Sequence, residues 1–475
     1  MMPNLIDSDI QGPASSLQLN LKTKLTYGVG EMSNEVPGSI LVFFLLFFLT
    51  NRAGLNPGLA GSVLLVAKIW DAVNDPLVGW LSDRTTSSKW GRRYPWMLFG
   101  AIPLGVSFCL LWWVPPLANQ GLLFGYYVAV TLLFYTALTA VAVPYTTLAA
   151  ELTETYDERT ALVSFKAAFS IASSILGLVV AQIIIGAVAD PKLQYVILGA
   201  IAGTIACLAA YLCVWGTRQR FMHIQSERQA SRRATVLPIV QQFKVALSNR
   251  PFLFVAGIYL CSWLGLQVTA AMLPYYVVNW MGLPEEHFTQ MALAVQGTAF
   301  LMMFVWSMLA QRIGKQAVYC CGIPLTLVAQ ASLFVIQPGQ VGLMYAAGVM
   351  AGAGLAVAYL VPWSLLPDVV DLDELNTRER REGVFFGLVV QLQKVAVALA
   401  IFMVGKILDG SGFIAAGADQ AAPVQPDSAL WAIRWLIGLV PSVVLLGGWL
   451  LAYFYPITRQ VHGEILLKLH RQRQS

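Results

Sequence analysis

The sequence predicts an all-α membrane protein with twelve transmembrane helices in two six-helix halves. Of its 475 residues, 57% are apolar and 12% are charged, and the mean hydropathy is +0.66. A water-soluble domain does not reach these values. Apolar runs of about 20 residues recur along the chain, as transmembrane helices require. The runs are continuous, whereas the strands of a transmembrane β-barrel alternate polar and apolar residues over about 10 residues each.

The apolar runs divide into two sets of six, separated by a polar and basic segment at 217–250. This segment is predicted to be a central cytoplasmic linker between an N-terminal half (26–216) and a C-terminal half (251–455), flanked by an arm (1–25) and a basic tail (456–475). The first half contains predicted helices at 26–50, 59–82, 96–115, 121–150, 161–188 and 193–216. The second half contains them at 251–281, 288–311, 317–336, 341–366, 384–409 and 429–455.

Lysine and arginine gather on one side of the predicted bundle, in both terminal segments and in the loops that follow the even-numbered helices. The opposite loops contain only Arg52 and Lys192, with Arg434 at the start of the last helix. Because cytoplasmic loops carry the excess of basic residues, we expect both termini in the cytoplasm of a multi-pass inner-membrane protein. The net charge of +5 has the same origin, so no nucleic-acid partner is expected.

A weak internal repeat supports two equivalent halves. The segment 79–84 and the triplet 91–93 (Gly-Arg-Arg) follow the second predicted helix. The segment 309–315, which follows the eighth, is weakly similar to them in sequence. Equivalent positions in two six-helix halves indicate parallel repeats related by an axis along the membrane normal.

The second predicted helix carries charges in the middle of an apolar run. Lys68, Asp71 and Asp75 are spaced i, i+3 and i+7, which places them on one helical face. Each charge costs roughly 2.5 to 3.5 kcal/mol at mid-membrane. The alternative to a functional role is a buried Lys–Asp pair that serves packing. Asp71, Asn74 and Asp75 supply the oxygen ligands that a small cation prefers, so we expect a cation site, with Asp71 and Asp75 as the Na⁺ ligands of a sodium-coupled protein.

Other ionisable residues in apolar segments are candidates for solute binding. Glu35 lies deep in the first helix, where a carboxylate can bind hydroxyl groups or carry a proton. Lys394, in the eleventh helix, is a natural counter-charge to the aspartates of the opposite half, and snorkelling is its alternative role. Lys166 lies early in the fifth helix, where snorkelling to the cytoplasmic surface is equally consistent with its position.

A densely charged segment, 367–383, follows the tenth helix. With the charges after the second helix, it is predicted to form a cytoplasmic network that latches the two halves. Exposed ion pairs contribute about 0 to 1 kcal/mol each, so such a latch requires several pairs; a merely solvated loop is the alternative. The candidate latch residues are Asp83, Arg84, Arg92, Arg93, Asp368 and Arg381.

Three segments resemble the glycoside-pentoside-hexuronide cation symporters of the major facilitator superfamily, the group of the melibiose permease. They are Lys-Leu-Thr-Tyr-Gly-Val-Gly at 24–30, Trp-Asp-Ala-Val-Asn-Asp-Pro at 70–76, and the stretch from Leu-Pro-Asp at 366–368 to Arg-Glu-Gly at 381–383, before Lys394. The resemblance runs through nearly the whole chain and implies the major facilitator fold.

The resemblance also implies residue roles. Thr139 joins Asp71, Asn74 and Asp75 in the cation site, and Lys394 is associated with that site. Glu35 stands where the family has a sugar-binding aspartate. The second sugar carboxylate and a nearby tryptophan are replaced by Ala142 and Thr146, which puts galactoside specificity in doubt. Lys166 falls near an arginine of the fifth helix.

The predicted function is cation-coupled symport of a sugar or glycoside by alternating access, with Na⁺, Li⁺ or H⁺ as the coupling ion. The neutral oxygens of Asn74 and Thr139 favour Na⁺, because a proton needs only a carboxylate. The alternative solute is a lysophospholipid-like amphiphile, which a mainly aliphatic cavity would favour. We expect a monomer in the lipid bilayer that needs no cofactor.

Two further classes of function are disfavoured. A transport-inactive receptor or scaffold predicts large soluble appendages, and none is visible in the sequence. An enzyme is not expected, because we find no nucleophile constellation or phosphate-binding glycine loop. The four histidines lie in predicted loops or the tail without metal-binding spacing: His223, His287, His462 and His470.

Overall fold

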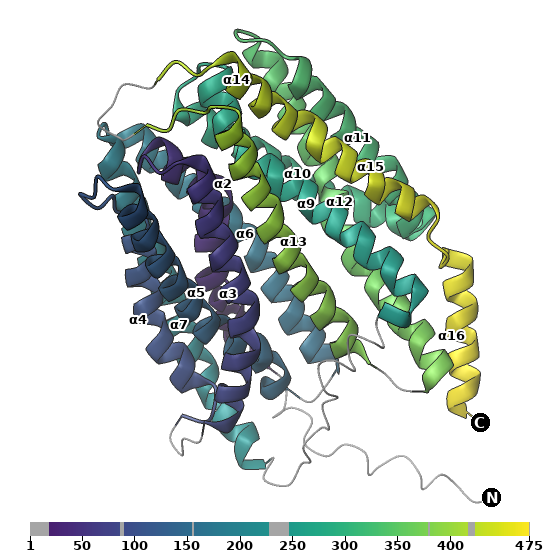
Figure 1. Ribbon diagram of the computed structural model, residues 1–475. Coiled ribbons are helices and arrows are strands. Elements are labelled where there is room, and N and C mark those ends of the chain that lie inside the picture. The colour runs from purple at the N-terminus through teal and green to yellow at the C-terminus, as the bar shows by residue number, and fades with distance from the viewer. Residues whose placement is uncertain are drawn as a thin grey trace, which may run out of the picture.

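The computed structural model describes residues 19–85, 90–153, 156–227, 247–378, 381–416 and 423–474. In these ranges the chain forms two bundles of helices that lie side by side (Figure 1). The first contains α1 (Leu21–Gly30), α2 (Met32–Asn51), α3 (Pro57–Arg84), α4 (Tyr94–Leu111), α5 (Gln120–Leu152), α6 (Tyr156–Ala187) and α7 (Pro191–Glu227). The second contains α9 (Arg250–Tyr275), η1 (Tyr276–Trp280), α10 (Glu285–Ile313), α11 (Lys315–Val335), α12 (Val341–Thr377), α13 (Glu382–Gly410), α14 (Asp427–Arg434), η2 (Trp435–Leu439), α15 (Val440–Tyr453) and α16 (Arg459–Gln474).

These elements confirm the predicted all-α fold with many membrane spans. Helices α1 and α2 form the first span, α9 continues into the π-helical turn η1, and α14, η2 and α15 form the last. Eleven spans in the described ranges are long and apolar enough to cross a membrane. Helix α3 is long enough as well, with 28 residues, but Lys68, Asp71, Asn74 and Asp75 lower its hydropathy.

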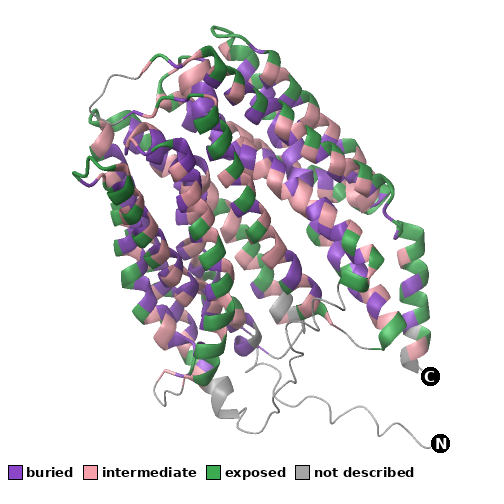
Figure 2. Ribbon diagram, viewed as in Figure 1, coloured by how far each residue is buried: buried purple, intermediate pink, exposed green. Residues whose placement is uncertain are grey.

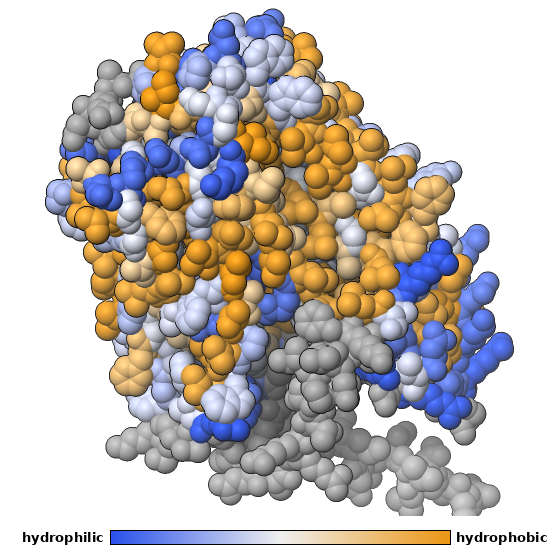
Figure 3. Space-filling view, viewed as in Figure 1, coloured by the Kyte–Doolittle hydropathy of each residue, from blue (hydrophilic) through white to orange (hydrophobic). Residues whose placement is uncertain are grey.

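Large apolar side chains cover the outside of the bundle. Phe99, Leu301 and Val443 are 81%, 66% and 61% exposed on three different spans. Figure 2 shows exposed residues along the outer faces of the helices and buried ones between them. Figure 3 shows hydrophobic side chains over the middle of one face and hydrophilic ones towards its ends. An exposed apolar surface of this extent is typical of contact with lipid.

The two halves pack against each other through three helix pairs: α3 with α13, α6 with α10, and α2 with α9. The tightest crossing joins the start of α3 to the end of α13, where glycines let the backbones approach. A Cβ atom on Gly405 would lie 2.5 Å from the carbonyl oxygen of Pro57 and 2.9 Å from Cα of Gly61. The crossing lies at the end of the bundle away from α16 (Figure 1).

Helices extend beyond their predicted ends on the side of the termini. Helix α7 continues to Glu227, so the first part of the predicted linker is helical; its residues 228–246 lie outside the described ranges. Helix α12 continues to Thr377 through the segment predicted as a charged loop. Most of the predicted tail forms α16, which buries Ile465 and Leu469 in the core of the second half. The predicted arm lies outside the described ranges up to residue 18.

We expect Gly405→Ala to destabilise the protein by roughly 1 to 3 kcal/mol, the usual cost of overpacking. The added methyl group would force α3 and α13 apart at their closest crossing. Thermal unfolding of the purified protein measures the effect. Gly387→Ala, on the same helix, is the matched control because a Cβ there meets nothing within 4 Å. Equal melting temperatures for the two variants would contradict the tight crossing.

Candidate functional site

A cavity of about 620 Å³ lies between the halves. Residues of α2, α3, α5 and α6 line it from the first half, and residues of α9 to α13 and α15 line it from the second. The predicted site residues Glu35, Asp71, Asp75, Thr139 and Lys394 all contribute to the lining. The structure therefore brings together, around one chamber, residues that are far apart in the sequence.

Lys394 bridges the two aspartates of α3 from the opposite half. Its Nζ donates a hydrogen bond to Oδ2 of Asp75 at 2.5 Å and lies 3.0 Å from Oδ2 of Asp71. The Asp71 side chain is only 8% exposed. An ammonium group shared by two carboxylates leaves one negative charge in excess, which is the charge that a monovalent cation neutralises.

One neutral side chain contacts this cluster, and a second is buried next in sequence to Asp75 but is not among the described residues that line the cavity. The Thr139 hydroxyl of α5 donates a hydrogen bond to Oδ1 of Asp75 at 3.1 Å. Asn74 is buried, and its Nδ2 has no hydrogen-bond partner in the described ranges. Two carboxylates with a hydroxyl and an amide form an all-oxygen donor set, which suits a hard cation. In the described ranges, no group of three or more His, Cys, Asp or Glu side chains is placed to hold a metal ion.

Lys68 lines the same cavity but stands apart from this cluster. It is half-buried, and its Nζ lies 4.8 Å from the centre of the Tyr135 ring. Among the described residues, no carboxylate oxygen lies within 4.0 Å of Lys68 Nζ. The Lys68–Asp packing pair that helical spacing allows is therefore not formed, and Lys394 occupies the position beside the aspartates.

The other predicted solute-binding residues divide into two groups. Glu35 and Thr146 line the cavity, and Oε1 of Glu35 accepts a hydrogen bond from Asn34 at 3.4 Å. Lys166 is not among the described lining residues. Its Nζ lies 3.6 Å from Oε2 of the buried Glu31. Lys166 therefore neutralises a buried carboxylate of its own half instead of facing the chamber.

The cavity is closed at the end away from the termini by contacts between the halves. Arg52, the C-cap residue of α2, forms an ion pair with Glu285 of α10. The hydroxyl groups of Thr50 and Tyr275 lie 2.6 Å apart. Thr289 donates a hydrogen bond to Gln182. The hydrogen bonds between described residues of the two halves lie at this sealed end or around the chamber.

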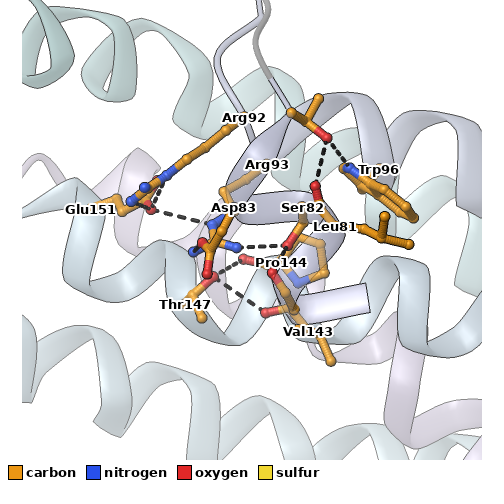
Figure 4. A network of polar contacts seen from close by, with 12 residues as sticks. Leu81, Ser82, Asp83, Arg92, Arg93, Trp96, Val143, Pro144, Thr147 and Glu151 are labelled. Carbon is orange, nitrogen blue, oxygen red and sulfur yellow. Dashed lines mark hydrogen bonds and ion pairs between the residues drawn. The ribbon is translucent and has the colours of Figure 1, made fainter. Parts of the chain in front are cut away.

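The predicted latch residues lie at the other end, and their described contacts stay within each half. Arg93 contacts Asp83 at 2.5 Å, and Arg92 contacts Glu151 at 2.5 Å (Figure 4). The Arg84 guanidinium stacks on Trp80, 3.9 Å from the ring centre. In the second half Lys315 pairs with Asp368 at 2.7 Å, and Arg381 is the N-cap residue of α13. A latch between the halves stays a prediction.

Polar and apolar lining residues occupy different depths. On α2 and α3 the apolar lining residues lie nearer the sealed end than the polar ones, and on α9 and α13 the lining residues nearest that end, Leu273 and Ile401, are apolar. We call the first group the apolar dome; its representative members are Leu45, Leu46, Leu64, Leu273, Val397 and Ile401. We call the second group the polar belt; its members include Glu35, Lys68, Asp71, Asp75, Gln393 and Lys394. A single ligand in this chamber could therefore contact a polar zone with one end and an apolar zone with the other.

Sequence reasoning missed several polar lining residues in the second half. Trp263, Gln267 and Gln296 face the cavity, and Gln296 donates a hydrogen bond to Ser174 of the first half at 3.1 Å. Gln267 and Gln296 each interrupt an apolar run, as the predicted charged residues do, whereas Trp263 is itself part of one. The sealing pair Arg52–Glu285 joins positions 233 residues apart, and no local pattern indicates it.

Comparisons of the sequence with known families and proteins agree with the geometry. The profile of a family described as MFS/sugar transport protein matches residues 26–459. An uncharacterized symporter of Synechocystis sp. is 44% identical over 97% of this chain and 98% of its own. The sodium-dependent lysophosphatidylcholine symporter 1 of Mus musculus is 25% identical over 98% of this chain and 90% of its own.

Solved structures share the fold. The nucleoside transporter NupG superposes with a TM-score of 0.61 at 15% identity, covering 92% of this chain and all of its own. The xylose transporter XylE from E. coli superposes with a TM-score of 0.56 at 15% identity, covering 92% of this chain and 95% of its own. At this level of identity the likeness concerns the arrangement of helices alone.

We expect Lys394→Ala to lower stability by roughly 3 to 5 kcal/mol in sodium-free buffer, because it leaves two carboxylates without their shared counter-charge. Added Na⁺ should then restore more stability to the variant than to the wild type. Melting temperatures with and without NaCl measure this. Lys406→Ala, an exposed lysine on the same helix, is the control. A variant with wild-type stability and no larger response to Na⁺ would contradict the cluster.

Proposed function

Because the chain belongs to the MFS/sugar transport protein family and is a secondary active symporter, we propose that it couples entry of a monovalent cation to transport of an amphiphilic solute. It is a multi-pass membrane transporter and not an enzyme. One observation carries the proposal: a chamber between the halves contains a carboxylate cluster with one excess negative charge beneath an apolar dome.

The proposed cation site consists of Asp71, Asn74, Asp75 and Thr139. The cation takes the place of the Lys394 ammonium between the carboxylates, and Lys394 then moves aside. Since Lys394 belongs to α13 and the aspartates to α3, this exchange alters a contact between the two halves. We favour Na⁺ over H⁺ because two neutral oxygen donors adjoin the carboxylates; the sodium dependence named for the mouse relative supports this choice.

Alternating access follows from where the halves touch. The sealed end lies opposite α16, the last described helix (Figure 1). If both termini lie on the cytoplasmic side of the inner membrane, as the basic loops indicate, the chamber is sealed on the opposite side. The protein is then in the inward-facing state. Rocking of the halves would separate Arg52 from Glu285 and join the terminal-side charges in the latch, exposing the chamber to the other side.

We favour an amphiphile as the solute because the two lining zones match its two ends. A polar head fits the belt, and an apolar chain fits the dome and is removed from water there, at roughly 25 cal/mol for each Å² buried. The loss of the second sugar carboxylate at Ala142 agrees with this choice, and Ala142 lines the cavity. Lysophosphatidylcholine, named for the mouse relative, is a solute of this class.

A sugar or glycoside is the second candidate, and the second half supplies the observation that favours it. Trp263 offers an aromatic platform, and Gln267 and Gln296 offer amides at the same cavity. Sugar sites are built from such groups. An alkyl glycoside would use both the amides and the dome.

We expect Asp75→Asn to abolish cation-dependent uptake by proteoliposomes, because the neutral amide removes the excess negative charge that attracts the cation. The same change should eliminate stabilisation by Na⁺ while leaving the helical content unchanged. Asp427→Asn, at the start of α14 and outside the cavity lining, is the control. Undiminished sodium-driven uptake by the Asp75 variant would remove this cluster from the mechanism.

The solute class is tested by thermal stabilisation of purified protein with Na⁺, Li⁺ or neither, across lysolipids, alkyl glycosides and free sugars. We expect lysolipids to stabilise most, and more so with Na⁺. Glu35→Gln should weaken solute binding more than Na⁺ binding, because Glu35 lies in the belt but outside the aspartate cluster. Equal losses of both, or stabilisation by free sugars alone, would contradict the assignment.

A further inference from the structure

The chamber contains one ammonium group that the cation site does not use. We propose that Lys68 binds an anionic group, a phosphate or a carboxylate, of the transported solute. The inference rests on the proposed function only in requiring that a solute enters this chamber. It adds a charge requirement that neither the amphiphile nor the sugar assignment contains.

The pairing of charges in the chamber carries the inference. Five charged side chains of the belt line the cavity: Glu35, Lys68, Asp71, Asp75 and Lys394. Lys394 lies within 3.0 Å of both aspartates, whereas no carboxylate of the described residues is within 4.0 Å of Lys68 Nζ. The two lysines are therefore not equivalent, and Lys68 is the cationic group that is left for a ligand.

The position of Lys68 is defined by a neighbouring helix. Its Nζ lies 4.8 Å from the centre of the Tyr135 ring, and Tyr135 is buried on α5 and lines the same cavity. A cation held against an aromatic ring is attracted by the negative face of that ring. This contact fixes the ammonium group without neutralising its charge, so its remaining protons are available to an anion.

Keeping such a lysine in a membrane span costs free energy, because a charged side chain is taken out of water. An ion pair with a solute offsets this cost only while the solute is bound. Hydrogen bonds to charged groups contribute about 1.5 to 3 kcal/mol, which corresponds to at least a roughly tenfold gain in affinity.

The placement also couples the two ligands. Lys68 and Asp71 are one helical turn apart on α3, so a cation among the carboxylates and an anion at Lys68 would be neighbours of opposite charge. Each would strengthen binding of the other by the same factor, as linkage requires.

The test compares three probes that share an eight-carbon chain: octyl phosphate, octanoate and octyl glucoside, each below its micellar concentration. Glucuronate and glucose form a second pair without the chain. Dissociation constants are measured for the full-length protein in nanodiscs, with NaCl or with N-methylglucamine chloride. The variants are Lys68→Gln and, as the charge-conserving control, Lys68→Arg; circular dichroism checks that both fold.

We expect the anionic member of each set to bind at least roughly tenfold more tightly than the neutral one, and more tightly still with Na⁺. Lys68→Gln should remove this preference, so that the anionic probe of each set binds no more tightly than the neutral one, while Lys68→Arg keeps the preference. Octyl phosphate and octanoate show which anion is favoured.

Equal affinity of the wild type for anionic and neutral probes would overturn the inference while leaving the amphiphile assignment intact. A Lys68→Gln variant that loses Na⁺ affinity but keeps the anion preference would overturn it too, because Lys68 would then belong to the cation site. If glucuronate and glucose bind but none of the octyl probes does, the amphiphile assignment is refuted instead. The ratio of the affinities for glucuronate and glucose would still decide the role of Lys68.

Discussion

The arrangement of this protein depends on the cost of charges in a low-dielectric span. Asp71 and Asp75 cannot both be charged in the bilayer without a counter-ion, and the ammonium of Lys394 supplies it from the opposite half. This requirement ties α3 to α13 around the chamber. The glycine crossing of the same two helices lies nearer the sealed end, so one helix pair provides both the closest contact between the halves and the contact that the proposed cation exchange would change.

Much of the fold was predictable because segments that contact lipid must be apolar, and this requirement is visible in the sequence. Each span needs about 20 apolar residues, and an unexplained charge within one marks a site, which is how Asp71, Asp75, Glu35 and Lys394 were found. Resemblance to a family added Thr139. The pairing of Lys166 with Glu31 was not predictable, because it depends on how α6 packs against the first span. The ends of α7 and α12 could not be predicted from apolar runs because the last turns of both helices are polar.

The chamber reconciles two chemistries that the comparisons name separately. The family description refers to sugars, and a relative of similar length is named for a lysolipid. Aromatic and amide groups of the second half lie at the same cavity as a dome of leucine, valine and isoleucine. The same cavity therefore carries groups suited to each of the two solutes proposed above.

The isolation of Lys68 from the aspartate cluster has an electrical consequence. A monovalent cation carried with a neutral solute moves one elementary charge across the bilayer, and a potential of about 100 mV contributes about 2.3 kcal/mol to that step. When the solute brings a single negative charge to Lys68, the loaded carrier crosses without net charge. The cation and the solute together then carry no net charge, so a complete cycle is driven by the concentration gradients alone and the membrane voltage contributes nothing to it.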